Sequence, residues 1–172
     1  MYHLQGKTER VTPAALLALL ADLYRDKLRL RQRHVAAARL VSHYEFNNTY
    51  QYVIAREDTH LEWLRAAVAD LGGTPEEVAE PEVRAPGRGR QALEALLRDE
   101  VAQADAFIET WRARIPAITH ARHGKMCQVV LGETLEHRRL FAQALEGRED
   151  LLGRRTGGLT TGGGVLPTRW VE

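Results

Sequence analysis

The stretch YQYVIAREDTHLEWL, residues 50–64, decides the fold class, because it places a carboxylate and an imidazole on the apolar side of a helix. Apolar residues recur here at alternating steps of three and four, which is typical of a helix that buries one face. Glu57 and His60 take two consecutive positions of that apolar series. Burying an unpaired carboxylate is costly, so something inside the protein has to compensate the charge. A metal ion is the first candidate.

The bulk properties of the chain describe one globular domain. It has 172 residues, of which 44% are hydrophobic and 27% charged, with a formal net charge of +1. This length is sufficient for a sizeable core, and the near-neutral charge argues against a nucleic-acid or membrane-surface binder. Cys127 is the one cysteine, which excludes an internal disulfide and a paired-cysteine metal centre. No apolar run approaches membrane-spanning length and no signal-like segment begins the chain, so we expect a cytoplasmic protein.

Four helices are predicted, with a Pro-rich and Gly-containing segment between the second and the third. Thr12 is a suitable N-cap and Pro13 a suitable first residue for the first helix. The glycines at 72 and 73 are suitable C-caps for the second. No strand-like alternation competes with these patterns. The predicted helices cover about residues 12–44, 50–71, 90–115 and 119–147.

This order predicts an all-α protein, an antiparallel four-helix bundle whose two helix pairs are joined by a long crossover. The bundle is expected to cover residues 12–147. Residues 148–172 are rich in glycine and predict a flexible C-terminal tail. Trp170 and Val171 are apolar, so docking of this tail on a partner is the alternative.

The third and fourth helices also place ionisable groups in their apolar series: Glu100 in the third, and Glu133 with His137 in the fourth. A single buried glutamate is more often paired with an arginine, but five ligand-type residues in matched positions favour a shared site. Glutamate and histidine three or four residues apart project from one helix face. Such sets hold two metal ions inside helical bundles, and carboxylates with imidazoles suit iron or manganese.

The spacing around Pro116 provides a separate argument. Glu100 lies 16 residues before this proline and Glu133 lies 17 residues after it. If the chain turns near Pro116, the two glutamates are expected at the same level of the bundle.

Together these residues resemble the ferritin-like superfamily, and its rubrerythrin branch in particular. YQYVIAREDTH resembles the aromatic, Ala and E-x-x-H run of that family, and ETLEHRRLFAQAL resembles its second histidine-bearing helix. The resemblance covers about residues 15–145. It implies a di-iron protein, with manganese as the alternative metal, that reduces oxygen or peroxide as an oxidoreductase of the peroxidase or oxidase kind. It also implies a homodimer.

The first helix departs from the family pattern, because it has no glutamate. Counting back from Glu57 by the separation of Glu100 and Glu133 gives Tyr24, which is not a carboxylate. Asp26 is the expected substitute. Asp22 and His34 are the alternatives.

Two further departures concern the fourth helix and the domain content. His137 follows Glu133 by four residues in an E-x-x-E-H pattern, so Glu136 is a competing outer ligand. There is no rubredoxin domain, so the electron relay of full rubrerythrins is missing. The expected metal ligands are Glu57, His60, Glu100, Glu133, His137 and Asp26.

Two alternatives to this oxidant chemistry stay open at the level of sequence. One is a ferritin-like oxidase acting on an organic substrate, which requires a substrate pocket. The other is a metal-free or degenerate bundle that serves as a structural or partner-binding protein. In the second case an arginine would neutralise Glu57 or Glu100.

Overall fold

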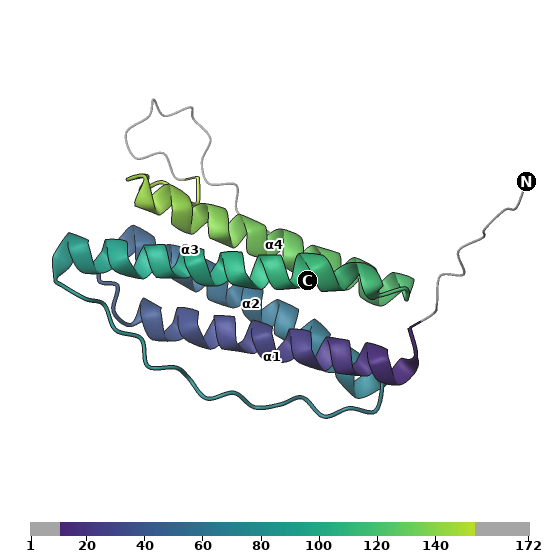
Figure 1. Ribbon diagram of the computed structural model, residues 1–172. Coiled ribbons are helices and arrows are strands. Elements are labelled where there is room, and N and C mark those ends of the chain that lie inside the picture. Colours follow the sequence, from purple (N-terminus) through teal and green to yellow (C-terminus); the bar gives the residue numbers. More distant parts are fainter. Residues whose placement is uncertain (1–10, 154–172) are drawn as a thin grey trace, which may run out of the picture.

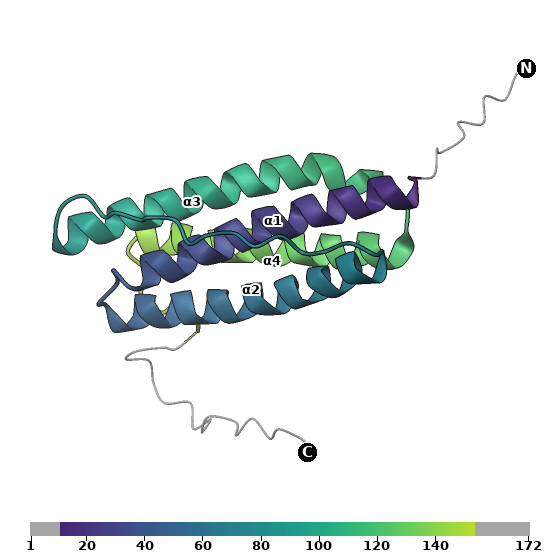
Figure 2. The same cartoon turned by 90° about the horizontal axis from the view of Figure 1, so that it is seen from below.

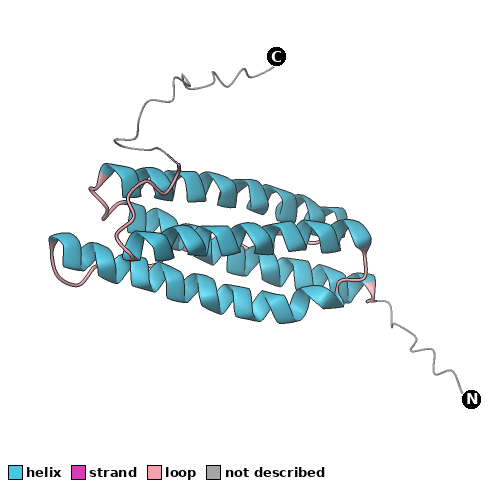
Figure 3. Ribbon diagram, turned by 90° about the horizontal axis from the view of Figure 1, so that it is seen from above, coloured by secondary structure: helices cyan, strands magenta, loops and turns pink. Residues whose placement is uncertain are grey.

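The computed structural model describes residues 11–153, and every regular element in this part of the chain is helical (Figures 1 and 3). The prediction of an all-α bundle is confirmed. The sequence pattern ran through residues 39–43, where the structure instead has a turn. Most of the predicted tail, residues 154–172, lies outside the described residues. The elements are α1 (Pro13–Ala38), α2 (Tyr44–Asp70), α3 (Gly89–Arg114), η1 (Ile115–Ala117) and α4 (Ala121–Leu145).

The ends of the first two helices are stabilised by side chains that the sequence supplies. Thr12 caps α1, because its side-chain oxygen accepts a hydrogen bond from the backbone nitrogen of Ala15 at 3.2 Å. At the other end, the amide of Asn47 donates to the carbonyl oxygens of Ala38 and Val41 at 3.1 and 3.2 Å. Ala38 is the last residue of α1 and Val41 lies in the turn that follows, so Asn47 bonds to carbonyl groups at the place where the helix ends. These bonds also fix α2 against α1.

α1 packs along α2, and α3 packs along α4, to form the two halves of the bundle (Figure 1). The buried apolar residues fall into two clusters. On α2, one cluster ends at Ile54 and the other begins at Leu61. Glu57 and His60 therefore lie between the two apolar clusters. Within residues 11–153, none of the helices has both the length and the apolar character needed to span a membrane.

The segment from residue 71 to 88 connects the two halves and runs along the outside of α1 (Figure 2). Gly72 turns the chain out of α2 with a φ of 80°, in the left-handed region that favours glycine. Gln32 of α1 donates a hydrogen bond to the carbonyl oxygen of Val78 at 3.4 Å, and Arg39, the C-cap residue of α1, pairs with Glu80. The crossover is thus held against α1 by side chains of that helix.

Candidate functional site

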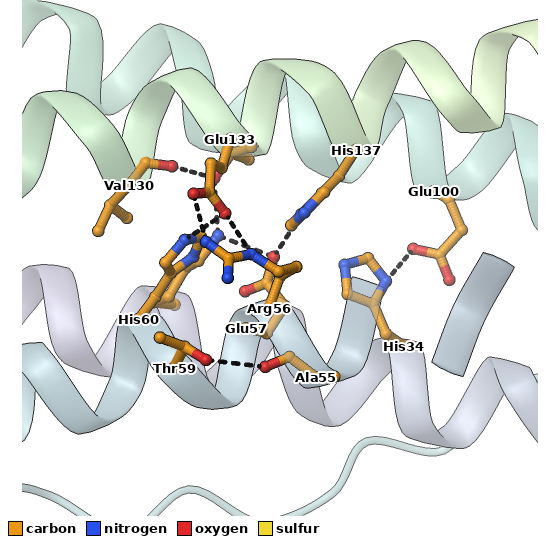
Figure 4. Close-up of polar contacts among 12 residues, drawn as sticks. His34, Ala55, Arg56, Glu57, Thr59, His60, Glu100, Val130, Glu133 and His137 are labelled. Carbon is orange, nitrogen blue, oxygen red and sulfur yellow. Dashed lines mark hydrogen bonds and ion pairs between the residues drawn. The ribbon is translucent and has the colours of Figure 1, made fainter. Parts of the chain in front are cut away.

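A cluster of charged and polar side chains lies in the middle of the bundle (Figure 4). Glu57 and His60 extend from α2, Glu133 and His137 from α4, and Lys27 from α1. Glu57, His60 and Lys27 are fully buried, and His137 is nearly so. The structure therefore brings together four of the six predicted ligands. The fifth member of the cluster, Lys27, was not among the predicted site residues.

Lys27 provides the positive charge at the centre of the cluster. Its Nζ donates hydrogen bonds to Oε1 of Glu57 at 2.8 Å and to Oγ1 of Thr134 at 2.6 Å. Burial lowers the pKa of Lys27, and the charge of Glu57 opposes this shift. Burial alone would raise the pKa of Glu57, but Lys27 and the hydrogen bond with His137 outweigh it and hold that pKa at about 2. Lys27 and Glu57 therefore form an ion pair.

The two histidines contact one carboxylate each. Nδ1 of His137 lies 2.9 Å from Oε1 of Glu57, the oxygen that also accepts from Lys27. Nε2 of His60 lies 2.9 Å from Oε2 of Glu133. Burial, with a further contribution from the charge of Lys27, lowers the pKa of His60 to about 4. Two buried atoms of this cluster, Oε2 of Glu57 and Nδ1 of His60, have no hydrogen-bond partner.

Glu133 connects the cluster to the surface. Its side chain is 28% exposed, and it pairs with Arg56, whose Nε donates to Oε2 at 2.8 Å. The hydrogen bond from Arg56 lowers the pKa of Glu133, an effect that outweighs its partial burial. Arg56 was not predicted as a site residue. The sequence feature that could have identified Arg56 is its position four residues before His60, which places both residues on neighbouring turns of one helix face.

Glu100 lies apart from the other predicted ligands. Its Oε1 accepts a hydrogen bond from the hydroxyl of Tyr50 at 3.1 Å, and its Oε2 lies 2.9 Å from Nδ1 of His34, without the alignment of a hydrogen bond. Burial and the charge of Glu100 raise the pKa of Tyr50 well above its ordinary value. Figure 4 places Glu100 and Glu133 on opposite sides of His137. The spacing around Pro116 therefore does not bring the two glutamates together.

Asp26 is directed away from the cluster. Its Oδ2 accepts a hydrogen bond from Nε1 of Trp111 at 3.2 Å, and its Oδ1 lies 3.4 Å from Arg29. The alternative, Asp22, pairs with arginines at positions 25 and 114. The first-helix residue that meets Glu57 is Lys27 instead. One series at alternating steps of four and three contains it: Leu16, Leu20, Leu23, Lys27, Leu30 and His34, all of which are buried.

The cluster contains donor types that metal sites use, but its side chains do not converge on one point. Across the described residues, no three histidine, cysteine, aspartate or glutamate side chains converge closely enough to hold an ion as they stand. Two carboxylates and two imidazoles are nevertheless present, and one atom of each kind, Oε2 of Glu57 and Nδ1 of His60, is buried without a hydrogen-bond partner. Lys27 places an ammonium group 2.8 Å from Oε1 of Glu57, so α1 contributes a cation at this point of the cluster. An ion bound here would also have to draw Glu133 away from Arg56.

Comparison of the chain with models of known protein families gave no match, and comparison with curated proteins gave none either. The geometry of the cluster is therefore the basis for assigning a function.

Proposed function

We propose that the protein is a ferritin-like antiparallel bundle that binds one iron or manganese ion beside a buried lysine and reduces a small oxidant there, such as oxygen or peroxide. The observation that carries this proposal is the meeting of Glu57 and His60 with Glu133 and His137 next to Lys27. The long crossover between the two helix pairs supports the ferritin-like arrangement. Histidine nitrogens and carboxylate oxygens with open positions are typical of sites for ferrous iron.

The charge of Lys27 supports one ion rather than two. Two unit charges 4 Å apart interact by about 4 kcal/mol at the effective dielectric constant of partly buried sites, so an ammonium and a dication repel by about 8 kcal/mol. Any ion beside Glu57 would meet that repulsion, and a second ion would in addition lack the carboxylate that a first-helix glutamate would supply. Lys27 therefore takes the place of a second cation in the charge balance of the site.

A ferrous or manganous ion held by Glu57, His60, Glu133 and His137 would supply one electron at a time, so complete reduction of the oxidant would require an external reductant that restores the ion. The protein's own residues prepare the site for the ion. Lys27 keeps Glu57 ionised and fixed in orientation, and Thr134 holds Lys27 through a 2.6 Å hydrogen bond. The hydroxyl of Thr134 in turn donates to the carbonyl oxygen of Val130 at 2.7 Å. Because these contacts exist before any ion binds, they restrict the ways in which the carboxylate can rearrange.

The burial of the cluster supports a small oxidant over an organic substrate. Glu57 and His60 have no exposed surface. Cavities of about 490 and 500 Å³ lie elsewhere, one between α1, α3 and the crossover, and the other at the end of the bundle beside Phe46. An organic substrate in either cavity would be separated from the cluster by packed side chains, whereas oxygen and peroxide are small enough to diffuse between helices.

Elemental analysis of the purified protein, before and after anaerobic incubation with ferrous iron, tests the proposal. We expect about one equivalent of metal, which is lost in Glu57→Gln and in His137→Gln. Glu136→Gln is the matched control, because Glu136 follows the same helix but is exposed and pairs with Arg139. Circular dichroism confirms that each variant is folded. A wild type that neither contains nor takes up metal would overturn the proposal.

A metal-free bundle that serves as a structural or partner-binding protein is the second candidate. It is favoured by one observation: Lys27 pairs with Glu57 and Arg56 pairs with Glu133, so two carboxylates of the cluster are compensated without an ion. The same elemental analysis separates the two candidates. The expected homodimer stays a prediction, which sedimentation velocity at several protein concentrations tests.

A further inference from the structure

The seam between α2 and α4 is the place where the buried cluster comes closest to solvent. Glu133 is 28% exposed, whereas the side chain of His60 directly beneath it is fully buried. Two partly exposed aromatic residues of α2 flank this point. The ring of Trp63 lies 5.7 Å from that of His60, and the ring of Tyr52 lies 6.4 Å from that of His137. Both histidines therefore lie just under this seam.

One carboxylate oxygen controls how His60 is covered. Oε2 of Glu133 accepts from Nε of Arg56 at 2.8 Å and also lies 2.9 Å from Nε2 of His60. Arg56 and Glu133 are 36% and 28% exposed, whereas His60, which Glu133 contacts, is fully buried, so the pair covers His60. Figure 4 shows the three side chains together. If the side chain of Glu133 turns outward, its contacts with Arg56 and with His60 break at the same time. The seam then opens without any movement of a helix.

The seam between α1 and α3 is the competing route. His34 of α1 lies under that seam beside Glu100 of α3, and its side chain is 1% exposed. Trp111 of α3 is also fully buried there, and its Nε1 is held by Asp26 of α1. The crossover segment covers this side of the bundle, with Val78 and Pro81 lining the cavity between it and the two helices. His34 therefore reports on this route, whereas His60 and His137 report on the seam between α2 and α4.

We propose that the seam between α2 and α4 is the entrance to the cluster, and that the Arg56–Glu133 ion pair closes it. The identity of what enters, a small oxidant, rests on the proposed function. The location of the entrance does not. Side chains near the surface exchange conformations much faster than helices separate, so opening this ion pair is the least demanding way to reach His60.

Carbethoxylation of histidines by diethyl pyrocarbonate, followed residue by residue with mass spectrometry, tests the inference on the metal-free full chain. The comparison is between wild type, Arg56→Gln and Arg138→Gln. Arg138 is the matched control, because its guanidinium pairs with Asp105 through two nitrogens, at 2.8 and 3.1 Å, on a different face of the bundle. We expect His60 to react about tenfold faster in Arg56→Gln than in wild type, and at the wild-type rate in Arg138→Gln.

His34 provides an internal reference within each sample, since it is as deeply buried as His60. We expect its rate to be the same in all three proteins. Equal His60 rates in wild type and Arg56→Gln would overturn the inference. So would faster reaction of His34 than of His60, which would indicate the other seam, or equal acceleration by both variants, which would indicate general loosening. Because metal is absent, a failure of metal binding and a failure of this inference are separate results.

Discussion

Nζ of Lys27 lies 2.8 Å from Oε1 of Glu57, and neither side chain has any exposed surface. The contact joins α1 to α2, and the hydrogen bond from Lys27 to Thr134 adds α4. A buried ion pair contributes little net stability, because removing two charges from water costs about as much as their attraction returns. Breaking the pair is another matter, since the remaining charge is left buried without a partner. The folded state is therefore sensitive to a change at either position.

Lys27→Met is expected to lower the free energy of unfolding of the metal-free protein by about 3 to 5 kcal/mol, the cost of an uncompensated buried charge. Glu57→Gln is expected to cost a similar amount. The double variant should cost clearly less than the sum of the two, because no unpaired charge remains. Urea unfolding in the presence of a chelator measures all four proteins. Strictly additive losses would show that the two residues do not compensate each other.

Lys27→Glu is expected to raise the metal content from about one to about two equivalents. The substitution removes the competing cation and supplies a carboxylate where the first helix lacks one. Lys27→Met removes the charge but adds no ligand, so it should stay near one equivalent. Elemental analysis of protein purified with ferrous iron distinguishes these outcomes. An unchanged content in Lys27→Glu would show that the lysine is not what limits the site to one ion.

The metal-free protein is expected to lose stability as the pH falls from 6.5 to 4. Burial lowers the pKa of His60 from 6.5 to about 4, so in this range the unfolded chain holds a proton that the folded protein does not. At about 1.4 kcal/mol for each pKa unit, the loss is about 3 kcal/mol. Urea unfolding at several pH values measures it. His60→Gln should weaken the dependence of stability on pH, whereas His43→Gln, at an exposed position, should leave this dependence unchanged.

Tyr50→Phe is expected to destabilise the protein by about 1 to 3 kcal/mol, because Glu100 loses the hydroxyl that donates to its buried Oε1. Tyr52→Phe is the control. Tyr52 lies on the same helix but is 47% exposed, so its change should stay within about 0.5 kcal/mol. Thermal unfolding followed by circular dichroism compares them. Equal losses of stability in Tyr50→Phe and Tyr52→Phe would show that the hydrogen bond to Glu100 does not stabilise the fold.

Asp26→Asn is expected to leave the metal content unchanged. Asp26 binds Trp111 and Arg29 and does not contact the cluster, and the asparagine oxygen can still accept from the indole of Trp111. Its effect should appear instead as a modest loss of stability, about 1 kcal/mol. Elemental analysis and urea unfolding are measured on the same preparation. Loss of metal with retained folding would identify Asp26 as a ligand.

The helices and three of the buried polar residues of α2 and α4 could be predicted from sequence for physical reasons. Glu57, His60 and His137 interrupt strong apolar series, and a charged group in such a series is conspicuous. The start of α1 carried the capping signal of Thr12 and Pro13, which the structure confirms. The end of α2 carried the glycines that turn the chain out of the helix.

Lys27 was missed because a buried lysine contradicts the usual preference of that side chain for solvent. Asp26 was predicted instead because it is a carboxylate, although the next residue, Lys27, continues the buried series of α1. Counting back from Glu57 by the separation of Glu100 and Glu133 did not give its partner on α1, because these two glutamates have different partners and do not contact each other. Partners across helices depend on rotation about each helix axis, which spacing along one chain does not determine.

The crossover at residues 71–88 is the single covalent link between the helix pair that holds Lys27 and Glu57 and the pair that holds Glu133 and His137. It lies outside the bundle and is held mainly by side chains of α1. A cut within it would therefore leave two hairpins, the first with its own charge pair already matched. Fragment complementation becomes a natural assay: the two peptides should reassemble when mixed, and only the reassembled pair would regain the complete set of donors.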